Sequence, residues 1–355
     1  MVMRPLALAA AALSTLFAGP PAHARRAHGR SHARAGKSRA VPPLTRDGQP
    51  NIQAQAAVIM DLQGGGDYFA KNPDAVRPIA SISKLMAALV VLDSGLKMDG
   101  TQTITAEDRK VATGGARSRL FEGMTLTNKD LLHAMLIASD NRAVPALGRA
   151  IGLRPDGLAA AMTRKARALG LLHTAFQDPT GLDDGNVSTP REAIRMLRIA
   201  LANPTISEIL KKARYVAQPT NRRGAIEYVN TDMLVRTGRW QVLGGKTGYT
   251  DIARYCLVVA AKIGDREVGM AFLGAEGKLT RFGDFGRAAD WLLARPEVKP
   301  QLPAHASAGP AQAALPTQAA SPAQAAPPTQ AAPAGQAATP APAPAGAGAT
   351  QQAKP

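Results

Sequence analysis

The chain has 355 residues, a formal net charge of +17 and a single cysteine. Cys256 therefore cannot form an intrachain disulfide, and its place in the apolar stretch 255–263 predicts a buried strand residue. No basic patch is interleaved with aromatic residues, so the positive charge does not indicate binding to nucleic acid.

Both ends of the chain are unsuited to a packed core. Residues 1–24 combine an apolar run with helix-breaking prolines and a small-residue cleavage site, which predicts a secretory signal peptide and export to the periplasm. Residues 25–50 are expected to form a disordered basic arm that could contact anionic wall polymers or a membrane surface. Residues 298–355 are rich in Pro, Ala and Gln and predict a disordered tail. The predicted folded domain spans residues 51–297.

The first predicted elements of this domain are a hairpin and a buried helix. Residues 54–62 alternate as a strand, the glycines at 64–66 predict a turn, and residues 67–70 return as the partner strand. The stretch from Ser81 to Leu92 is almost wholly apolar and has helical length. It predicts a buried helix with Ser81 at its N-terminus, where free backbone N–H groups point outward.

Helices fill the middle of the domain, and strands return at its end. Apolar spacings of three and four predict helices over residues 128–137, 142–151, 156–169, 190–201 and 204–212. Strands at 255–263 and 267–273 follow, and a helix over 280–293 closes the domain. This order predicts an α+β fold, in which a discontinuous sheet domain carries a helical insertion and a cleft lies at their junction.

The string Ser81-Ile82-Ser83-Lys84 can supply a nucleophile and a base. Residues three apart share a face of a helix, so the Lys84 amine can lie beside the Ser81 hydroxyl. An alcohol becomes a good nucleophile when a neighbouring base removes its proton. A lysine can be that base if burial and a nearby cation lower its pKa, and Lys246 is the candidate cation.

Two further strings follow in order, Ser139-Asp140-Asn141 and Lys246-Thr247-Gly248. The first predicts a loop tip with the Ser139 and Asn141 side chains on one side, able to relay a proton and hold a carbonyl. The second predicts the start of a strand whose cation and hydroxyl face an anionic group. Gly248 leaves room for a substrate to lie against that strand.

Each string alone has an ordinary explanation as a helix start, a turn or a loop. Ser94-Gly95-Leu96-Lys97 and Arg236-Thr237-Gly238 match the first and third patterns equally well, so only the ordered set of three is specific. His133 and His173, the histidines of the folded unit, lie on helical patterns and lack metal-ligand spacing, which disfavours a zinc peptidase. A Ser-His-Asp triad is not excluded by count, but it is unnecessary if Lys84 is the base.

The three strings resemble the signature of penicillin-binding proteins. Over nearly the whole folded unit the chain is similar to serine-type D-alanyl-D-alanine peptidases, the low-molecular-mass penicillin-binding proteins. The similarity extends to residues 79–86, 179–182, 186–189 and 245–250. It implies a β-lactamase/transpeptidase-like fold, with an antiparallel sheet flanked by helices, and cleavage of peptidoglycan stem peptides. No cofactor or metal is implied, and β-lactams are expected to be covalent inhibitors.

Chemistry and resemblance together imply roles for the site residues. Lys84 would deprotonate Ser81, which attacks a D-alanyl carbonyl to form an acyl-enzyme. Ser139 would pass a proton to the leaving amine and Asn141 would orient the substrate amide. The substrate carboxylate would be held by the motif Lys246-Thr247-Gly248. Backbone N–H groups of Ser81 and Tyr249 would form the oxyanion hole.

Within this family the chain looks like the endopeptidase type, which cuts crosslinks, because the closing helix passes directly into the Pro/Ala-rich tail. Carboxypeptidases of the family typically add a β-rich domain and an amphipathic anchor, and a carboxypeptidase remains the alternative. A β-lactamase is disfavoured because no glutamate occurs between Glu122 and Glu192 to activate deacylating water. The alternative outside enzymology is an inactive wall-binding protein.

Overall fold

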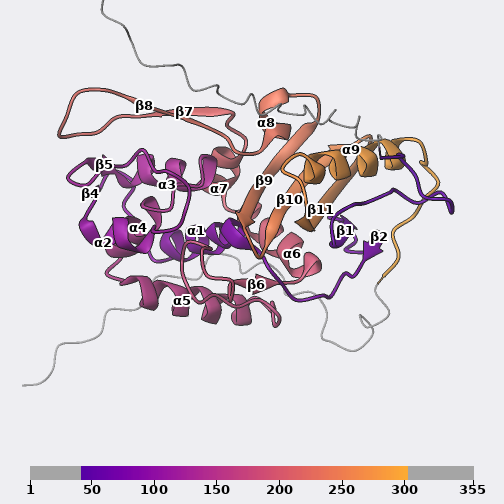
Figure 1. Cartoon of the computed structure of the whole chain (residues 1–355), viewed down its shortest axis with the longest axis horizontal. Coiled ribbons are helices and arrows are strands. Elements are labelled where there is room, and N and C mark those ends of the chain that lie inside the picture. The colour runs from indigo at the N-terminus through magenta and orange to yellow at the C-terminus, as the bar shows by residue number, and fades with distance from the viewer. Residues whose placement is uncertain (1–40, 303–355) are drawn as a thin grey trace, which may run out of the picture. The chain divides into compact units, whose positions relative to one another are not determined.

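The structure, a computed structural model, describes residues 41–302 of the chain (Figure 1). At its centre lies an antiparallel five-stranded sheet with the strand order β2-β1-β11-β10-β9. The strands are β1 (Ala56–Asp61), β2 (Asp67–Lys71), β9 (Gln241–Thr250), β10 (Arg254–Ile263) and β11 (Arg266–Ala275). Because β1 pairs with β11, with Val58 opposite Ala271, segments far apart in the sequence complete one sheet.

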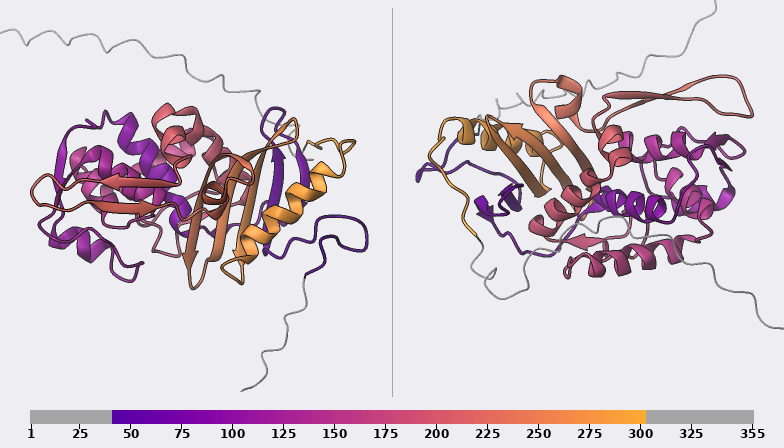
Figure 2. Two further views of the ribbon diagram at one scale, coloured as in Figure 1. Left: turned by 90° about the horizontal axis from the view of Figure 1, so that it is seen from above. Right: turned by 180° about the vertical axis from the view of Figure 1, so that it is seen from behind.

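Helices from the middle of the chain surround α1, whose residues from Lys84 to Val91 are all buried. α1 packs against α3, α4, α5 and α6 (Figure 2). The helices are α1 (Lys84–Asp93), α2 (Ala106–Val111), α3 (Asn128–Ile137), α4 (Ala143–Ala150), α5 (Pro155–Ala168), α6 (Pro190–Ala202), α7 (Pro204–Leu210), α8 (Met233–Thr237) and α9 (Thr280–Leu293).

The central sheet is covered on both faces. Alternating strand residues join separate cores: Val58 belongs to the core with Ile194 of α6, whereas Ile59 belongs to the core with Phe285 of α9. Figure 2 shows α9 lying across its face of the sheet. Since successive strand side chains point to opposite faces, burial on both faces explains why these strands are almost continuously apolar.

Three short strand pairs connect the larger elements. They are β3 (Arg77–Pro78) with β6 (Val187–Ser188), β4 (Thr101–Thr103) with β5 (Thr125–Thr127), and β7 (Arg214–Ala217) with β8 (Ile226–Val229). The β7–β8 hairpin is tied to α3, because the Tyr215 hydroxyl donates to Asp130 at 2.6 Å and its ring stacks on His133 at 3.7 Å.

Polar caps begin several helices where the sequence periodicity begins. Thr127 accepts from the backbone N–H of Asp130 at the start of α3, and Thr189 accepts from that of Glu192 at the start of α6. Asn203 accepts from the first N–H groups of α7. A side-chain cap contributes about 1 kcal/mol to helix stability. α3 and α6 begin at the predicted residues, directly after these caps, and end within one residue of the prediction.

The predicted α+β architecture is confirmed, with three local corrections. Ser81 lies not at the start of an α-helix but within the 3₁₀ turn η1 (Ala80–Ser83), and α1 starts at Lys84. Lys246 lies in the second half of β9 rather than at the start of a strand, because pairing with β10 extends the strand back to Gln241. His173 lies outside the helices, in a turn.

The ordered unit is longer at both ends than the predicted 51–297. Within the expected arm, Leu44 pairs with Pro50, and Trp291 of α9 donates to the Gly48 carbonyl at 3.1 Å. Within the expected tail, Gln301 pairs with Asp67 at the edge of β2. Backbone pairing, which composition does not reveal, extends the fold. The predicted signal peptide and most of the predicted arm and tail lie outside the described residues. Across residues 41–302 no helix has the length and apolarity needed to cross a bilayer.

Candidate active site

The serine of the first string lies in a tight turn enclosed by two glycines. Ala80, just before Ser81, has the left-handed φ of 49°. A Cβ atom on Gly181 would lie 2.2 Å from the Ala80 carbonyl oxygen, and one on Gly248 would lie 3.2 Å from the Ser81 nitrogen. The loop around Gly181 and strand β9 therefore press directly against the turn that presents Ser81.

Lys84 lies one helical turn beyond Ser81 and is completely buried. Its Nζ atom is 2.8 Å from Ser81 Oγ and 2.6 Å from Asn141 Oδ1, and it also donates to the Thr180 carbonyl. Burial lowers the pKa of Lys84 to about 7, although the carboxylates of Asp178 and Asp140 act in the opposite direction. Near neutral pH a large fraction of this amine is unprotonated and able to accept the Ser81 proton.

The second and third strings meet opposite this pair. Lys246 Nζ donates to Ser139 Oγ at 2.9 Å and to the Thr247 carbonyl at 3.0 Å. Ser139 has the left-handed φ of 61° in the connection between α3 and α4. Burial, followed by the cations Lys84 and Arg281, lowers the pKa of Lys246 well below its usual value. Two buried amines thus approach the Ser81 region from different elements.

A cleft of about 1190 Å³ opens over these residues. Its lining includes Ser81, Ser139, Asn141, Thr247, Gly248 and Tyr249. Lys84 and Lys246 lie beneath this lining and reach it through Ser81 and Ser139. The structure therefore brings all eight of the predicted site residues to one cleft, between the helical layer and β9.

Residues outside the three strings also build the site. The Asp178 carboxylate accepts from the Thr180 and Gly181 backbone N–H groups, from the Thr180 hydroxyl and from the Asp183 N–H. This fixes the Thr180 carbonyl that Lys84 contacts. In the sequence, Pro179-Thr180-Gly181-Leu182 was matched by resemblance to the family, and no chemical role was assigned to it. An Asp before such a turn is the available signal, because Asp side chains accept N–H groups two and three residues ahead.

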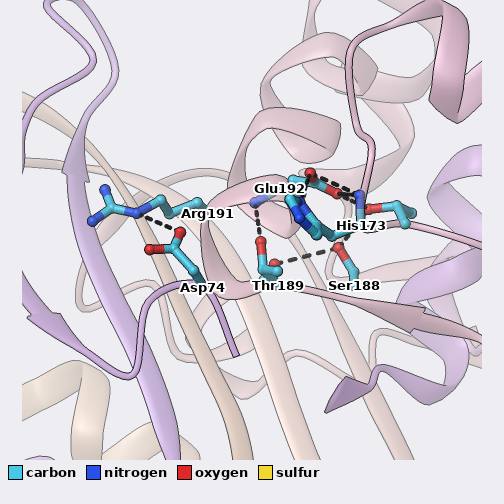
Figure 3. Close-up of polar contacts among 7 residues, drawn as sticks. Asp74, His173, Ser188, Thr189, Arg191 and Glu192 are labelled. Atoms are coloured by element: carbon cyan, nitrogen blue, oxygen red, sulfur yellow. Dashed lines mark hydrogen bonds and ion pairs between the residues drawn. The ribbon is translucent and has the colours of Figure 1, made fainter. Parts of the chain in front are cut away.

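Figure 3 shows the contacts of the first turn of α6, which include His173 from the segment before this loop. Glu192 accepts from both the backbone N–H and the Nδ1 atom of His173 at 3.0 Å. On the same turn, Arg191 forms an ion pair with Asp74 at 3.0 Å. The two contacts of Glu192 anchor His173, which lies just before the loop that contains Thr180.

Arg281 is a buried cation that the sequence analysis did not select. From α9 it donates to the carbonyl of Gly248 at 2.9 Å, and it lines the cleft between the rings of Tyr255 and Phe282. It is 35 residues beyond Lys246 in the sequence, so only the tertiary fold reveals it. Its guanidinium places a positive charge at the wall of the cleft, which suits an anionic ligand.

We expect Asp178→Asn to shift the pH profile of the site and to destabilise the loop. Loss of the carboxylate removes a charge that raises the Lys84 pKa, so the midpoint for acylation of Ser81 should move to lower pH. Leaving backbone donors without a good acceptor should lower the free energy of unfolding by about 2 kcal/mol. Stopped-flow acylation by penicillin and thermal unfolding measure the two effects.

Asp183→Asn is the matched control, because Asp183 belongs to the same loop but is exposed and accepts only from Gly185 N among the contacts of its side chain. It should leave the pH midpoint unchanged. A profile of Asp178→Asn that coincides with wild type would contradict the assigned influence of Asp178 on Lys84.

Within residues 41–302, no group of three or more His, Cys, Asp or Glu side chains is placed to hold a metal ion. His133 stacks on Tyr215, and His173 contacts Glu192. Cys256 is fully buried in β10, in the strand predicted for it.

The fold and the Ser-Lys site define a penicillin-binding-protein type of serine peptidase, and comparison with known proteins agrees. The family model of peptidase S11, D-alanyl-D-alanine carboxypeptidase, matches residues 44–277. A D-alanyl-D-alanine endopeptidase of Escherichia coli is 35% identical over 251 residues, which cover 70% of this chain and 80% of the relative. A Pseudomonas aeruginosa protein of the same name is 34% identical, over 69% of this chain and 78% of its own length.

Solved structures lead to the same conclusion. The crystal structure of a Streptomyces DD-transpeptidase superposes with a TM-score of 0.64 at 27% identity, covering 69% of this chain and 98% of that one. The chain belongs to peptidase family S11 and is a serine-type D-Ala-D-Ala peptidase. This confirms the family and the fold inferred from the three strings.

Proposed function

We propose that the protein is an endopeptidase that cuts the crosslinks between peptidoglycan stem peptides through an acyl-enzyme on Ser81. The observation that carries the catalytic part is the 2.8 Å contact between Ser81 Oγ and the Lys84 amine, whose pKa burial lowers to about 7. A nucleophile and a base are thus in contact before substrate arrives.

In the first half-reaction, the Ser81 hydroxyl gives its proton to Lys84 as Oγ forms a bond to the D-alanyl carbonyl carbon. Asn141 Oδ1 is occupied by Lys84, so Nδ2 is the atom left to hold the substrate carbonyl. β9 passes Ser81 at Gly248, which supports an oxyanion hole made by the backbone N–H groups of Ser81 and Tyr249.

The tetrahedral intermediate then collapses as the carbon–nitrogen bond breaks. The proton that Lys84 took from Ser81 is passed through Ser139, which is already hydrogen-bonded to Lys246, to the leaving amine, so Lys84 becomes neutral again. Water then attacks the ester carbonyl and gives a proton to Lys84, and Lys84 returns this proton to Ser81 Oγ as the carbon–oxygen bond breaks. A β-lactam would acylate Ser81 in the same way, with the opened ring retained on the enzyme.

A substrate carboxylate is proposed to lie against Lys246, Thr247 and Arg281. Thr247 Oγ1 is 2.7 Å from Thr231 Oγ1, so its hydroxyl is oriented by a neighbour at the cleft wall. Arg281 donates to the Gly248 carbonyl and is buried beside the same strand. Paired cations and a fixed hydroxyl suit the carboxylate found next to the scissile bond.

The endopeptidase assignment is supported by the names of the two relatives at 34–35% identity. The alternative, a carboxypeptidase that trims terminal D-alanine, is supported by the description of the matching family model. Residues 1–24 are proposed to be a cleaved signal peptide, with the enzyme working in the periplasm on the cell wall.

Mass spectrometry distinguishes the two activities. The purified protein is incubated with crosslinked dimeric muropeptides and, separately, with pentapeptide monomers, with Ser81→Ala as the inactive control. Conversion of dimers to monomers is the expected result. Loss of one terminal alanine from the pentapeptide, with intact dimers, would replace the endopeptidase assignment by the carboxypeptidase one.

A further inference from the structure

The leaving group of the reaction has a definable place in the cleft. Ser139, the residue that would protonate the amine, contacts Lys246, and Thr231 contacts the adjacent Thr247. The acyl group is attached at Ser81, beside Gly248. The leaving group therefore extends from Ser81 toward the beginning of β9, past residues 229–236.

Residues 229–236 form a firmly held wall on that side. Asn230 Nδ2 donates to the Lys212 carbonyl at 2.9 Å, and Thr231 N donates to the Ile137 carbonyl at 2.9 Å. Asp232 is completely buried and caps α8 by accepting from Leu234 N at 2.9 Å. α8 also packs against β9. The wall is thus fixed to the helical layer and to the sheet.

Arg236 on α8 is the cation that this wall presents to the cleft. Its side chain lines the cleft together with Met233, and the residue is exposed. Within residues 41–302 the Arg236 guanidinium has neither a hydrogen bond nor an ion pair. Arg239, just beyond the helix, differs: it pairs with Asp290 at 3.8 Å, covers the Trp240 ring and does not line the cleft.

We propose that Arg236 binds a carboxylate of the second stem peptide, the acceptor strand that leaves when a crosslink is cut. This inference rests on the proposed function. A terminal alanine brings one carboxylate, which Lys246, Thr247 and Arg281 can take. A crosslinked leaving group is a longer acidic peptide whose further carboxylates lie beyond that site. A guanidinium binds a carboxylate through two parallel hydrogen bonds, which makes Arg236 suited to a second one.

The test compares Arg236→Gln, Arg236→Lys and the matched control Arg239→Gln in the purified protein. For each variant, kcat/KM is measured on a crosslinked dimer and on a dimer whose acceptor carboxylates are amidated except for the one next to the scissile bond, and the rate of acylation by penicillin is measured as well. Penicillin carries no acceptor strand, so its rate reports on acylation of Ser81 without any contact to such a strand.

Arg236→Gln should lower kcat/KM on the acidic dimer about tenfold, as expected for loss of a charged hydrogen bond. It should change neither cleavage of the amidated dimer nor acylation by penicillin. Arg236→Lys should retain part of the preference, and Arg239→Gln should behave as wild type.

An equal loss on acidic and amidated dimers, or no loss on either, would overturn the role of Arg236 while leaving endopeptidase activity in place. Wild-type protein that trims pentapeptides but cleaves neither dimer would instead overturn the endopeptidase assignment, and this inference with it.

Discussion

Replacing Lys84 with glutamine is expected to slow acylation of Ser81 by penicillin at least about a thousandfold, the upper range for loss of a positioned general base. The Lys84 amine contacts Ser81 Oγ at 2.8 Å, and glutamine can neither reach as far nor accept a proton at neutral pH. Stopped-flow fluorescence or quenched mass spectrometry gives the acylation rate.

The pH dependence of the acylation rate in the wild-type protein should also report the protonation state of Lys84. Since its pKa is lowered to about 7, the amine is protonated and inactive as a base below that pH. Acylation should therefore fall about tenfold per pH unit below pH 7 and level off above it. In Lys84→Gln this limb of the profile should disappear.

Lys97→Gln is the control for the lysine change. Lys97 belongs to the second Ser-x-x-Lys sequence, residues 94–97, in which both Ser94 and Lys97 are exposed. The Lys97→Gln variant should be acylated by penicillin at the wild-type rate. If Lys84→Gln retained a wild-type rate and pH profile, Lys84 would not be the base.

Gly181→Ala is expected to lower the acylation rate at least about a hundredfold, because misplacement of a reacting group by about 1 Å has effects of that size. A Cβ atom on Gly181 would lie 2.2 Å from the Ala80 carbonyl oxygen and 2.8 Å from the Ser81 nitrogen. Both are backbone atoms of the nucleophile's turn, so this turn or the loop must move. Acylation rate and thermal unfolding are measured together.

Gly170→Ala separates this contact from backbone strain. Gly170 has a similar left-handed φ of 72°, against 88° for Gly181, but a Cβ there would meet nothing within 4 Å. Gly170→Ala should lower the free energy of unfolding by about 1 kcal/mol and leave the acylation rate unchanged. Equal acylation by the two variants would show that Gly181 does not position the Ser81 turn.

Much of this site could be predicted because its reactive residues lie in three short segments of the sequence. Ser81 and Lys84 are three residues apart, so any helical geometry brings them together, and the structure does so through a 3₁₀ turn followed by α1. The long helices were predictable for a similar reason. In these helices the apolar spacing begins directly after a capping residue, such as Thr127 before α3 and Thr189 before α6.

The rest depends on contacts between distant segments. Arg281 reaches the cleft only because α9 packs on the sheet, and it contacts Gly248 from 33 residues away. Thr180 contributes to the site through its backbone carbonyl oxygen, which accepts from Lys84. Every residue has this atom, so the identity of residue 180 does not predict the contact. The order of the strands in the sheet likewise follows from pairing between β1 and β11, which no local pattern encodes.

The most direct test of a Ser81 acyl-enzyme is to incubate the protein with penicillin and locate the label by intact-mass and peptide mass spectrometry. One adduct per chain, on the peptide that contains Ser81 and absent from Ser81→Ala, is the predicted result. A label on another residue, or one that persists unchanged in Ser81→Ala, would contradict the assignment of Ser81 as the nucleophile.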